Sequence, residues 1–247
     1  MTLNFNGKTA LVTGAAHGFG RAISRAFAER GAHVWACDVL DEELRETEAL
    51  CRNAGGTCRA VIADVRDRAA VDACVAAASA ASGRVDILVN NAGGVLGQVG
   101  QPLEQITPQQ WQAIFDVNVT GAFYFSQAVA PGMKAARGGR IVNISSGAGL
   151  GISLTGIQAY ASAKAAQIGL TRQLAHELGP WASPSTTSRR GSCDPIRPPS
   201  GSGSRTARKV SAPWSIASRS SVWAQPTTSP TACCSSPRSM PAGSPAR

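Results

Sequence analysis

Short apolar runs alternate with longer stretches of helical periodicity through the first 181 residues of the chain. Runs rich in Val, Ile, Leu and Ala that end in glycine or a polar residue are typical of buried parallel strands. They occupy residues 8–13, 32–38, 56–63, 85–90 and 140–146. Helices are predicted over residues 20–30, 41–54 and 66–82, from residue 107 onward, and over 159–178. This alternation predicts an α/β fold with a doubly wound parallel sheet in a single domain.

Polar and glycine residues stand where the predicted strands end. Gly14, Asp38, Asp64 and Asn90 each lie at the carboxyl end of a strand. In open parallel sheets, ligands bind beyond these ends. The sequence therefore predicts one ligand site along this edge of the sheet.

A glycine-rich turn, GAAHGFG at residues 14–20, joins the first strand to the helix that follows it. Glycines let a backbone approach a pyrophosphate closely, and a helix N-terminus favours an anion, so we interpret the turn as a nucleotide-binding loop. Its spacing is GxxxGxG rather than GxGxxG, which leaves a plain tight turn as the alternative. His17 either contacts a phosphate or is an exposed loop histidine.

Asp38 ends the second strand, eighteen residues after Gly20. In dinucleotide-binding folds an acid at this position accepts hydrogen bonds from the adenosine ribose hydroxyls. It would repel a 2′-phosphate, and neither Cys37 nor Val39 offers a cation for one. The sequence therefore favours NAD over NADP. The alternative is that Asp38 caps the next helix.

Tyr160 and Lys164 are four residues apart in a predicted helix. Residues with that spacing lie on one helix face, a turn apart. A nearby ammonium favours the phenolate form of a tyrosine, which could then exchange a proton with an alcohol or carbonyl oxygen. Taken alone, the pair could also be two side chains that share a helix surface.

The long helix that begins at Thr107-Pro108 has Thr107 as its N-cap and proline in its first turn. Asn118 and Gly121 lie inside it and lower its helical propensity. Asn118 either makes an ordinary helix contact or marks a local kink that frees a backbone carbonyl to hold a water.

Charge separates the chain into two parts. The net charge is +9, but nine of the 24 Lys and Arg residues and only one of the 15 Asp and Glu residues follow Trp181. Residues 1–181 are therefore electrostatically ordinary and are the expected catalytic domain. The cysteines (37, 51, 58, 74, 193, 233 and 234) have no metal-binding spacing, and we expect reduced thiols and no metal. With no apolar run long enough to span a bilayer and no signal peptide, the expected location is the cytoplasm.

Together these motifs resemble the short-chain dehydrogenase/reductase family, across about residues 7–181. The matching segments are TGAAHGFG (13–20), Asp38, Asp64-Val65, NNAG (90–93), Asn118, Ser146 and YASAK (160–164). The resemblance implies a Rossmann-type domain that binds a nicotinamide cofactor, a small alcohol or ketone substrate and a homodimer or homotetramer. The spacing from Ser146 to Tyr160 is one residue longer than is usual in the family, so Ser146 is preferred to Ser145 by its place at the strand end.

The resemblance also implies roles for individual residues. Tyr160 is the acid/base, Lys164 holds the nicotinamide ribose, Ser146 bonds the substrate oxygen, and Asn118 positions a water in a proton relay. The cofactor-binding residues that it implies are Thr13, Gly14, His17, Gly18, Phe19, Gly20, Asp38, Asp64, Val65, Asn91, Ala92, Gly93, Tyr160 and Lys164. The expected function is NAD-dependent interconversion of a secondary alcohol and a ketone.

Residues 182–247 break this pattern. They contain seventeen serines and ten prolines and few large apolar residues, a composition that does not fill a core. One base over, codons for this segment can spell GITVNNVAPGFVRSNPTTERQ and TDDIAHGVLFFASEYAGWITGQ, which resemble the family's C-terminal segments. We therefore expect an irregular tail that results from a frameshift near Trp181, with the last strands missing or replaced.

Two other functions stay open. A chain whose tail is altered could bind the nucleotide without turning over a substrate. The Arg- and Ser-rich tail could instead bind nucleic acid, although it has few aromatic residues apart from Trp214 and Trp223. Because the frameshift hypothesis makes the tail's charge accidental, we expect no nucleic-acid partner.

Overall fold

The computed structural model describes residues 3–181, and their centre is a parallel sheet in the order β3-β2-β1-β4-β5. The strands are β1 (Thr9–Thr13), β2 (His33–Asp38), β3 (Thr57–Ile62), β4 (Ile87–Asn90) and β5 (Arg140–Asn143). Thr13 pairs with Cys37, and Asn90 pairs with Asn143, so the carboxyl ends of these strands lie along one edge. The predicted fold class is confirmed.

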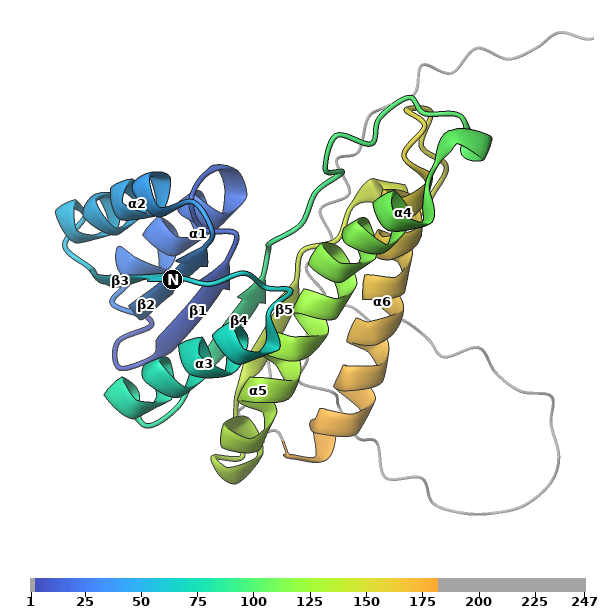
Figure 1. The fold of residues 1–247 in the computed structure, drawn as a ribbon. Coiled ribbons are helices and arrows are strands. Elements are labelled where there is room, and N and C mark those ends of the chain that lie inside the picture. The colour runs from blue at the N-terminus through green and yellow to red at the C-terminus, as the bar shows by residue number, and fades with distance from the viewer. Residues whose placement is uncertain (1–2, 182–247) are drawn as a thin grey trace, which may run out of the picture.

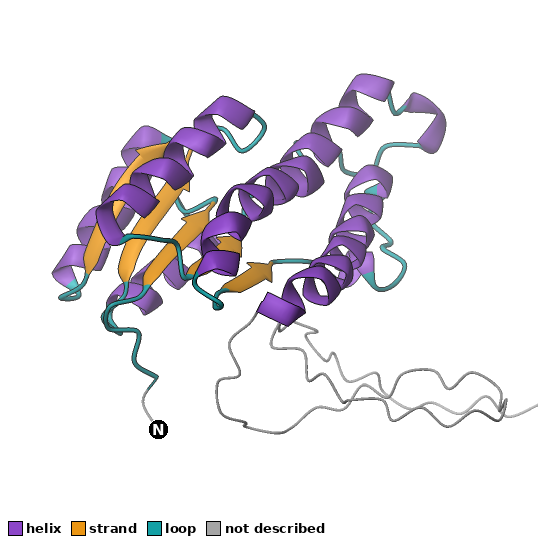
Figure 2. Cartoon of the chain, turned by 90° about the horizontal axis from the view of Figure 1, so that it is seen from below, coloured by secondary structure: helices purple, strands orange, loops and turns teal. Residues whose placement is uncertain are grey.

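Helices cover both faces of this sheet (Figures 1 and 2). Helices α1 (Gly18–Ala28) and α2 (Asp41–Asn53) pack on one face. The other face is covered by α3 (Arg68–Ser82), α5 (Gly121–Ala135) and α6 (Gln158–Leu178). Ahead of α5, α4 (Pro108–Phe115) begins with the predicted Thr107 cap, whose side chain accepts a hydrogen bond from Gln110 N.

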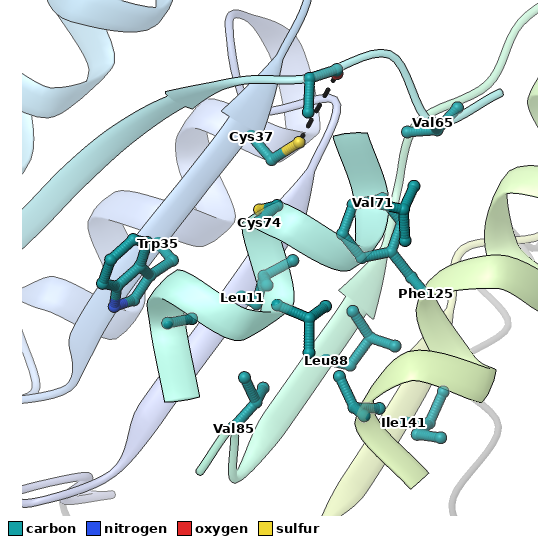
Figure 3. Packing of buried hydrophobic residues seen from close by; sticks show 14 of the residues in the cluster. Leu11, Trp35, Cys37, Val65, Val71, Cys74, Val85, Leu88, Phe125 and Ile141 are labelled. Carbon is teal, nitrogen blue, oxygen red and sulfur yellow. Dashed lines mark hydrogen bonds between the residues drawn. The ribbon is translucent and has the colours of Figure 1, made fainter. Parts of the chain in front are cut away.

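The two faces have separate cores because strand side chains alternate between them. Ala10 and Val12 of β1 point toward the α1–α2 face, whereas Leu11 joins the core under α3 and α5. Figure 3 shows this second core, in which Leu11 and Leu88 lie close to Val71 and Phe125. Phe125 is completely buried, so α5 is fixed against the sheet beside the carboxyl edge.

The main departure from the predicted elements is at β5. The predicted strand runs to residue 146, but β5 ends at Asn143. One further ladder bond, from Ile144 N to Asn90 O at 2.9 Å, follows the strand. The chain then leaves the sheet because Ser145 Oγ donates to the Lys164 carbonyl at 3.1 Å and Ser146 caps a 3₁₀ turn, η3 (Gly147–Gly149).

The predictions for residues 182–247, including the irregular tail and the frameshift near Trp181, lie outside the described residues. Within residues 3–181, β5 is the outer strand on the β4 side of the sheet, and β3 is the outer strand on the other side. No helix in this part of the chain is long and apolar enough to cross a membrane.

Candidate active site

The glycine-rich turn is tied to the loop after β4. Asn91 Nδ2 donates to the carbonyl oxygens of Thr13 at 3.1 Å and Gly14 at 2.9 Å. In return, Thr13 Oγ1 accepts from the backbone N–H groups of Asn91 and Ala92 at 3.1 and 3.0 Å. Gly14 has a φ of +64°, and a Cβ there would lie 2.7 Å from Ala92 Cα. Only glycine therefore fits where the two strand ends converge.

The N-terminus of α1 is open beside this turn. His17 is the N-cap residue, its side chain makes no capping bond, and it is exposed. Gly18 has a φ of +56°, and a Cβ at this position would meet no atom of residues 3–181 within 4 Å. Phe19 is also exposed. An open helix N-terminus behind a glycine turn fits a phosphate group.

Asp38 fixes the same turn from β2. Its Oδ2 accepts from Ala16 N at 2.9 Å, while Oδ1 accepts from Val39 N at 2.7 Å and Leu40 N at 3.2 Å. The N-cap of α2 is Leu40, which makes no side-chain capping bond, so the alternative in which Asp38 caps that helix is wrong. The carboxylate instead lies between the glycine turn and the start of α2.

Acidic residues follow Asp38 after two apolar positions, Val39 and Leu40. The first turn of α2 contains Asp41, Glu42 and Glu43. Arg21 of α1 reaches the same region, but its guanidinium is bonded to Glu46 at 2.9 Å and to the Glu43 carbonyl. Arg45 pairs with Asp41 at 3.0 Å, so the negative charge of this region comes mainly from Asp38, Glu42 and Glu43. The acids at the start of α2 can be read from the sequence, but the prediction of NAD over NADP rested only on Asp38 and its immediate neighbours.

Asp64 and Val65 follow β3 and have different surroundings. The Arg66 guanidinium contacts both carboxylate oxygens of Asp64, at 3.0 and 2.6 Å, and lowers the pKa of that carboxyl. The Val65 side chain is buried, and a Cβ on Gly121 would come within 2.7 Å of it. Val65 therefore packs inward against the start of α5.

At the far end of the edge, α6 presents Tyr160 and Lys164. Lys164 Nζ lies 5.6 Å from the Tyr160 ring centroid. The ammonium donates to the Ile144 carbonyl at 2.9 Å and to Gln167 Oε1 at 3.1 Å. Lys164 is 3% exposed, and this burial lowers its pKa to about 8. The helical spacing thus places a buried cation against the phenol ring.

Two serines precede this helix, and their partners distinguish them. Ser145 Oγ donates to the backbone carbonyl of Lys164, so its hydroxyl is committed to α6. Ser146 Oγ accepts a 3.3 Å bond from Ala148 N. The Ser146 hydroxyl proton is not used in that contact, which favours Ser146 over Ser145 as a donor to a ligand.

Asn118 lies in an interruption of the long helix. A π-helical turn, η2 (Asp116–Thr120), separates α4 from α5, so the helix is locally interrupted at Asn118, as one of the two alternatives requires. Asn118 is fully buried, and its Nδ2 donates to the carbonyls of Ile114 and Gly94, each at 2.9 Å. Gly94 N donates back to Asn118 Oδ1 at 3.1 Å. Single π turns are frequent at functional sites.

Gly93, in the loop after β4, lies against both Asn118 and Lys164. A Cβ on Gly93 would overlap Asn118 Oδ1 and lie 3.3 Å from Lys164 Nζ. On the other side of Lys164, a Cβ on Gly149 would lie 2.6 Å from the Lys164 carbonyl carbon. The loop after β4, η2 and the loop before α6 therefore converge on Lys164. Gly149 and Gln167 are not among the predicted site residues, because neither is recognisable without the fold.

A doubly wound sheet with a glycine turn at its switch point defines a Rossmann-type dinucleotide-binding fold. The family model described as "short chain dehydrogenase" matches residues 8–182. The chain belongs to this family.

Relatives with curated names support the assignment. Oxidoreductase UcpA of Escherichia coli K12 is 43% identical over 171 residues, which cover 69% of this chain and 64% of that protein. Sorbitol dehydrogenase of Cereibacter sphaeroides is 41% identical over 172 residues, with the same two coverages. The chain thus spans somewhat less than two thirds of the length of these relatives.

Solved structures agree with the fold. NAD+-bound xylitol dehydrogenase superposes with a TM-score of 0.68 at 35% identity, covering 73% of this chain and 68% of that one. A metagenomic short-chain oxidoreductase in complex with NADP gives a TM-score of 0.68 at 38% identity, covering 72% and 79%.

Proposed function

We propose that the protein is an NAD(H)-dependent oxidoreductase that interconverts a secondary alcohol and a ketone. The observation on which this depends is the pairing of Tyr160 with the buried ammonium of Lys164, 5.6 Å from the ring centroid. The names of related proteins support the substrate class, since sorbitol and xylitol are both polyols with secondary hydroxyls.

The residues of the edge fit a dinucleotide. The open N-terminus of α1 suits the pyrophosphate, and the Asp38 carboxylate suits the adenosine ribose. The structures of relatives include both an NAD+ and an NADP complex, so the family accepts either cofactor. The acids at the start of α2 support NAD for this chain, because they would repel a 2′-phosphate.

In the proposed mechanism the nicotinamide supplies the hydride acceptor or donor. Ser146 would hold the substrate oxygen through its hydroxyl. Tyr160 would remove the hydroxyl proton during oxidation and return it during reduction. Lys164 would stabilise the phenolate and bond the nicotinamide ribose. Asn118, fixed in the π turn, would hold a water that connects Lys164 to solvent.

The decisive test is Tyr160→Phe in the full chain, measured as NADH oxidation with a panel of ketones. General acid–base catalysis contributes roughly 10²- to 10⁴-fold. We therefore expect kcat to fall by at least about 100-fold while the Kd for NADH changes less than about twofold. Equal rates in the two proteins would contradict the assignment, and so would NADH binding without turnover of any panel member.

Tyr124→Phe is the matched control, since Tyr124 and Tyr160 are the two tyrosines of the chain. Tyr124 lies on α5, where its ring packs under the Arg68 guanidinium at 5.5 Å. We expect this variant to keep the wild-type kcat. A comparable loss in both variants would show that the loss reflects damaged folding rather than proton transfer.

We also propose that the protein forms a homodimer or homotetramer. Trp111 and Phe123, on α4 and α5, are 37% and 41% exposed in the single chain. Trp111 stacks on Phe115 with ring centroids 5.1 Å apart, so the exposed aromatic surface is ordered. Light scattering after size-exclusion chromatography tests this, and a monomer mass at micromolar concentration would contradict it.

A further inference from the structure

The ammonium of Lys164 is held by a side chain that the proposed mechanism does not use. Gln167 follows Lys164 by three residues on α6, and its Oε1 accepts a 3.1 Å hydrogen bond from Lys164 Nζ. An ammonium can only donate, so the amide atom that faces it must be the oxygen. Gln167 is 0% exposed and Lys164 is 3% exposed, so the contact is shielded from water.

A buried glutamine is a costly choice for packing alone. Within residues 3–181, Gln167 Nε2 has no hydrogen-bond partner. A leucine of similar volume would fill the position without leaving a buried donor unsatisfied. The feature of Gln167 that a leucine lacks is the oxygen directed at Lys164, which points to a role in holding the ammonium.

Among the described residues, the other groups around the ammonium are neutral acceptors or cannot accept. The Ile144 carbonyl bonds it from the end of β5, the Gly93 backbone and Asn118 lie beside it, and the Tyr160 ring faces it on α6. Tyr160 is the titratable side chain among them. No carboxylate in the described part of the chain forms an ion pair with Lys164.

We propose that Gln167 is a positioning residue that orients the ammonium of Lys164 toward the cofactor edge and stabilises its charged form. Two of the three Nζ donors bond Ile144 O and Gln167 Oε1, which leaves the third for the region of Gly93 and Tyr160. The significance of this orientation for catalysis rests on the proposed function, whereas the effect of Gln167 on Lys164 is measurable without turnover.

The test is NMR of the full chain labelled with ¹³Cε-lysine, in which the Cε–Hε signal reports the charge of each side chain. The chain has four lysines (8, 134, 164 and 209), and Lys164→Met assigns the signal of interest. Wild-type Lys164 should titrate with a midpoint near its pKa of about 8.

Gln167→Leu removes the acceptor and should lower the midpoint by about one pH unit, because hydrogen bonds to charged groups are among the stronger ones. Gln167→Glu places a carboxylate at the same position and should raise it by about one unit or more. Thr171→Val is the matched control. It removes the hydroxyl that donates to the Gln167 carbonyl and accepts from Asn143, but that hydroxyl does not bond the ammonium. Its midpoint should stay within about 0.3 units of wild type.

Opposite shifts in the leucine and glutamate variants support the proposal, because a purely structural role would not reverse sign. It is overturned if both variants shift the midpoint in the same direction, if neither shifts it, or if Thr171→Val shifts it as much as Gln167→Leu. Should the leucine variant fail to fold, Gln167→Met replaces it. If the Lys164 midpoint shifts in opposite directions in the two variants but the wild-type protein reduces no ketone, the positioning role of Gln167 stands and the proposed function is refuted.

Discussion

The two ends of the carboxyl edge are built in different ways. At the glycine-turn end, Thr13, Asn91 and Asp38 bind backbone groups through short neutral or carboxylate hydrogen bonds, and the start of α1 beside the turn is exposed. At the other end, Lys164 is a buried cation without an ionic partner among the described residues. The glycine-turn end stabilises the fold through close packing and backbone hydrogen bonds. The other end contains a buried ammonium, whose charged form burial disfavours. Substitutions at the two ends should therefore change stability in different ways.

The largest effect is expected at the glycine turn. Gly14→Ala combines a left-handed φ of +64° with a Cβ 2.7 Å from Ala92 Cα. Backbone strain of about 1–2 kcal/mol and overpacking of about 1–3 kcal/mol predict roughly 4 kcal/mol of destabilisation. Urea unfolding followed by circular dichroism measures it.

Gly18→Ala is the control for that substitution. Gly18 has a similar φ of +56°, but a Cβ there meets no atom of the described part of the chain within 4 Å. Strain alone predicts about 1 kcal/mol. If both alanine variants lose the same stability, the contact between the turn and the β4 loop does not hold the two strand ends together.

The second prediction concerns the buried cation. Burial lowers the pKa of Lys164 from 10.5 to about 8, so the folded state releases this proton more readily than the unfolded state. Between these two pH values the unfolded chain binds more protons than the folded chain does. The contribution of Lys164 to the free energy of unfolding therefore rises with pH. The shift corresponds to about 3 kcal/mol at most.

Comparison with Lys164→Met isolates this effect. The free energy of unfolding of wild type, minus that of the variant, should increase by about 3 kcal/mol between pH 7 and pH 11. The difference cancels other groups that titrate in this range, as well as any constant loss from leaving Ile144 O and Gln167 without a donor. A difference that is flat with pH would mean that Lys164 is hydrated in solution.

The glycine-turn end could be predicted from the sequence more completely than the Lys164 end. Gly14, Gly18 and Asp38 follow strands whose apolar runs are unambiguous, and local backbone geometry determines what a glycine turn can do. Helical spacing likewise predicts that Tyr160 and Lys164 share a face. The positions of these residues relative to strands and helices follow from local sequence patterns, which a single sequence contains.

What could not be predicted depends on contacts between distant segments. The early end of β5 follows from Ser145 bonding the Lys164 carbonyl, nineteen residues away. The contacts of Asn118 with Gly94 and of Asp38 with Ala16 also join separate elements. The role of Gln167 could not be predicted because a glutamine on a helix has no distinctive pattern until the ammonium beside it is located.

The third prediction tests the charge at the glycine-turn end. Asp38→Asn keeps one oxygen as an acceptor but removes the carboxylate's charge, which should raise the affinity for NADP relative to NAD by about tenfold, equivalent to about 1.4 kcal/mol. Energy transfer from tryptophan to bound NADH gives the dissociation constant of NADH, and the same measurement with NADPH gives that of NADPH. Asp72→Asn on α3, where Asp72 pairs with Arg68, is the control and should leave the ratio unchanged. An unchanged ratio in Asp38→Asn would refute the proposed basis for NAD preference.

The smallest effect is expected at the opposite edge of the sheet, where charge stabilises the fold. Burial raises the pKa of Asp86, but the Thr9 N–H, Arg84 and Lys8 together lower it below 3.8. The group therefore stabilises the folded state above that value, and this contribution is lost as the pH falls through the lowered pKa. Because the pair with Arg84 is partly exposed, Asp86→Asn should cost less than about 1 kcal/mol at pH 7, and the difference from wild type should shrink toward pH 2. The sign is opposite to that of Lys164, since Asp86 has cations beside it, whereas the acceptors of Lys164 within residues 3–181 are neutral. If Asp86→Asn also weakened NADH binding, the separation between a stabilising edge and a ligand-binding edge would be wrong.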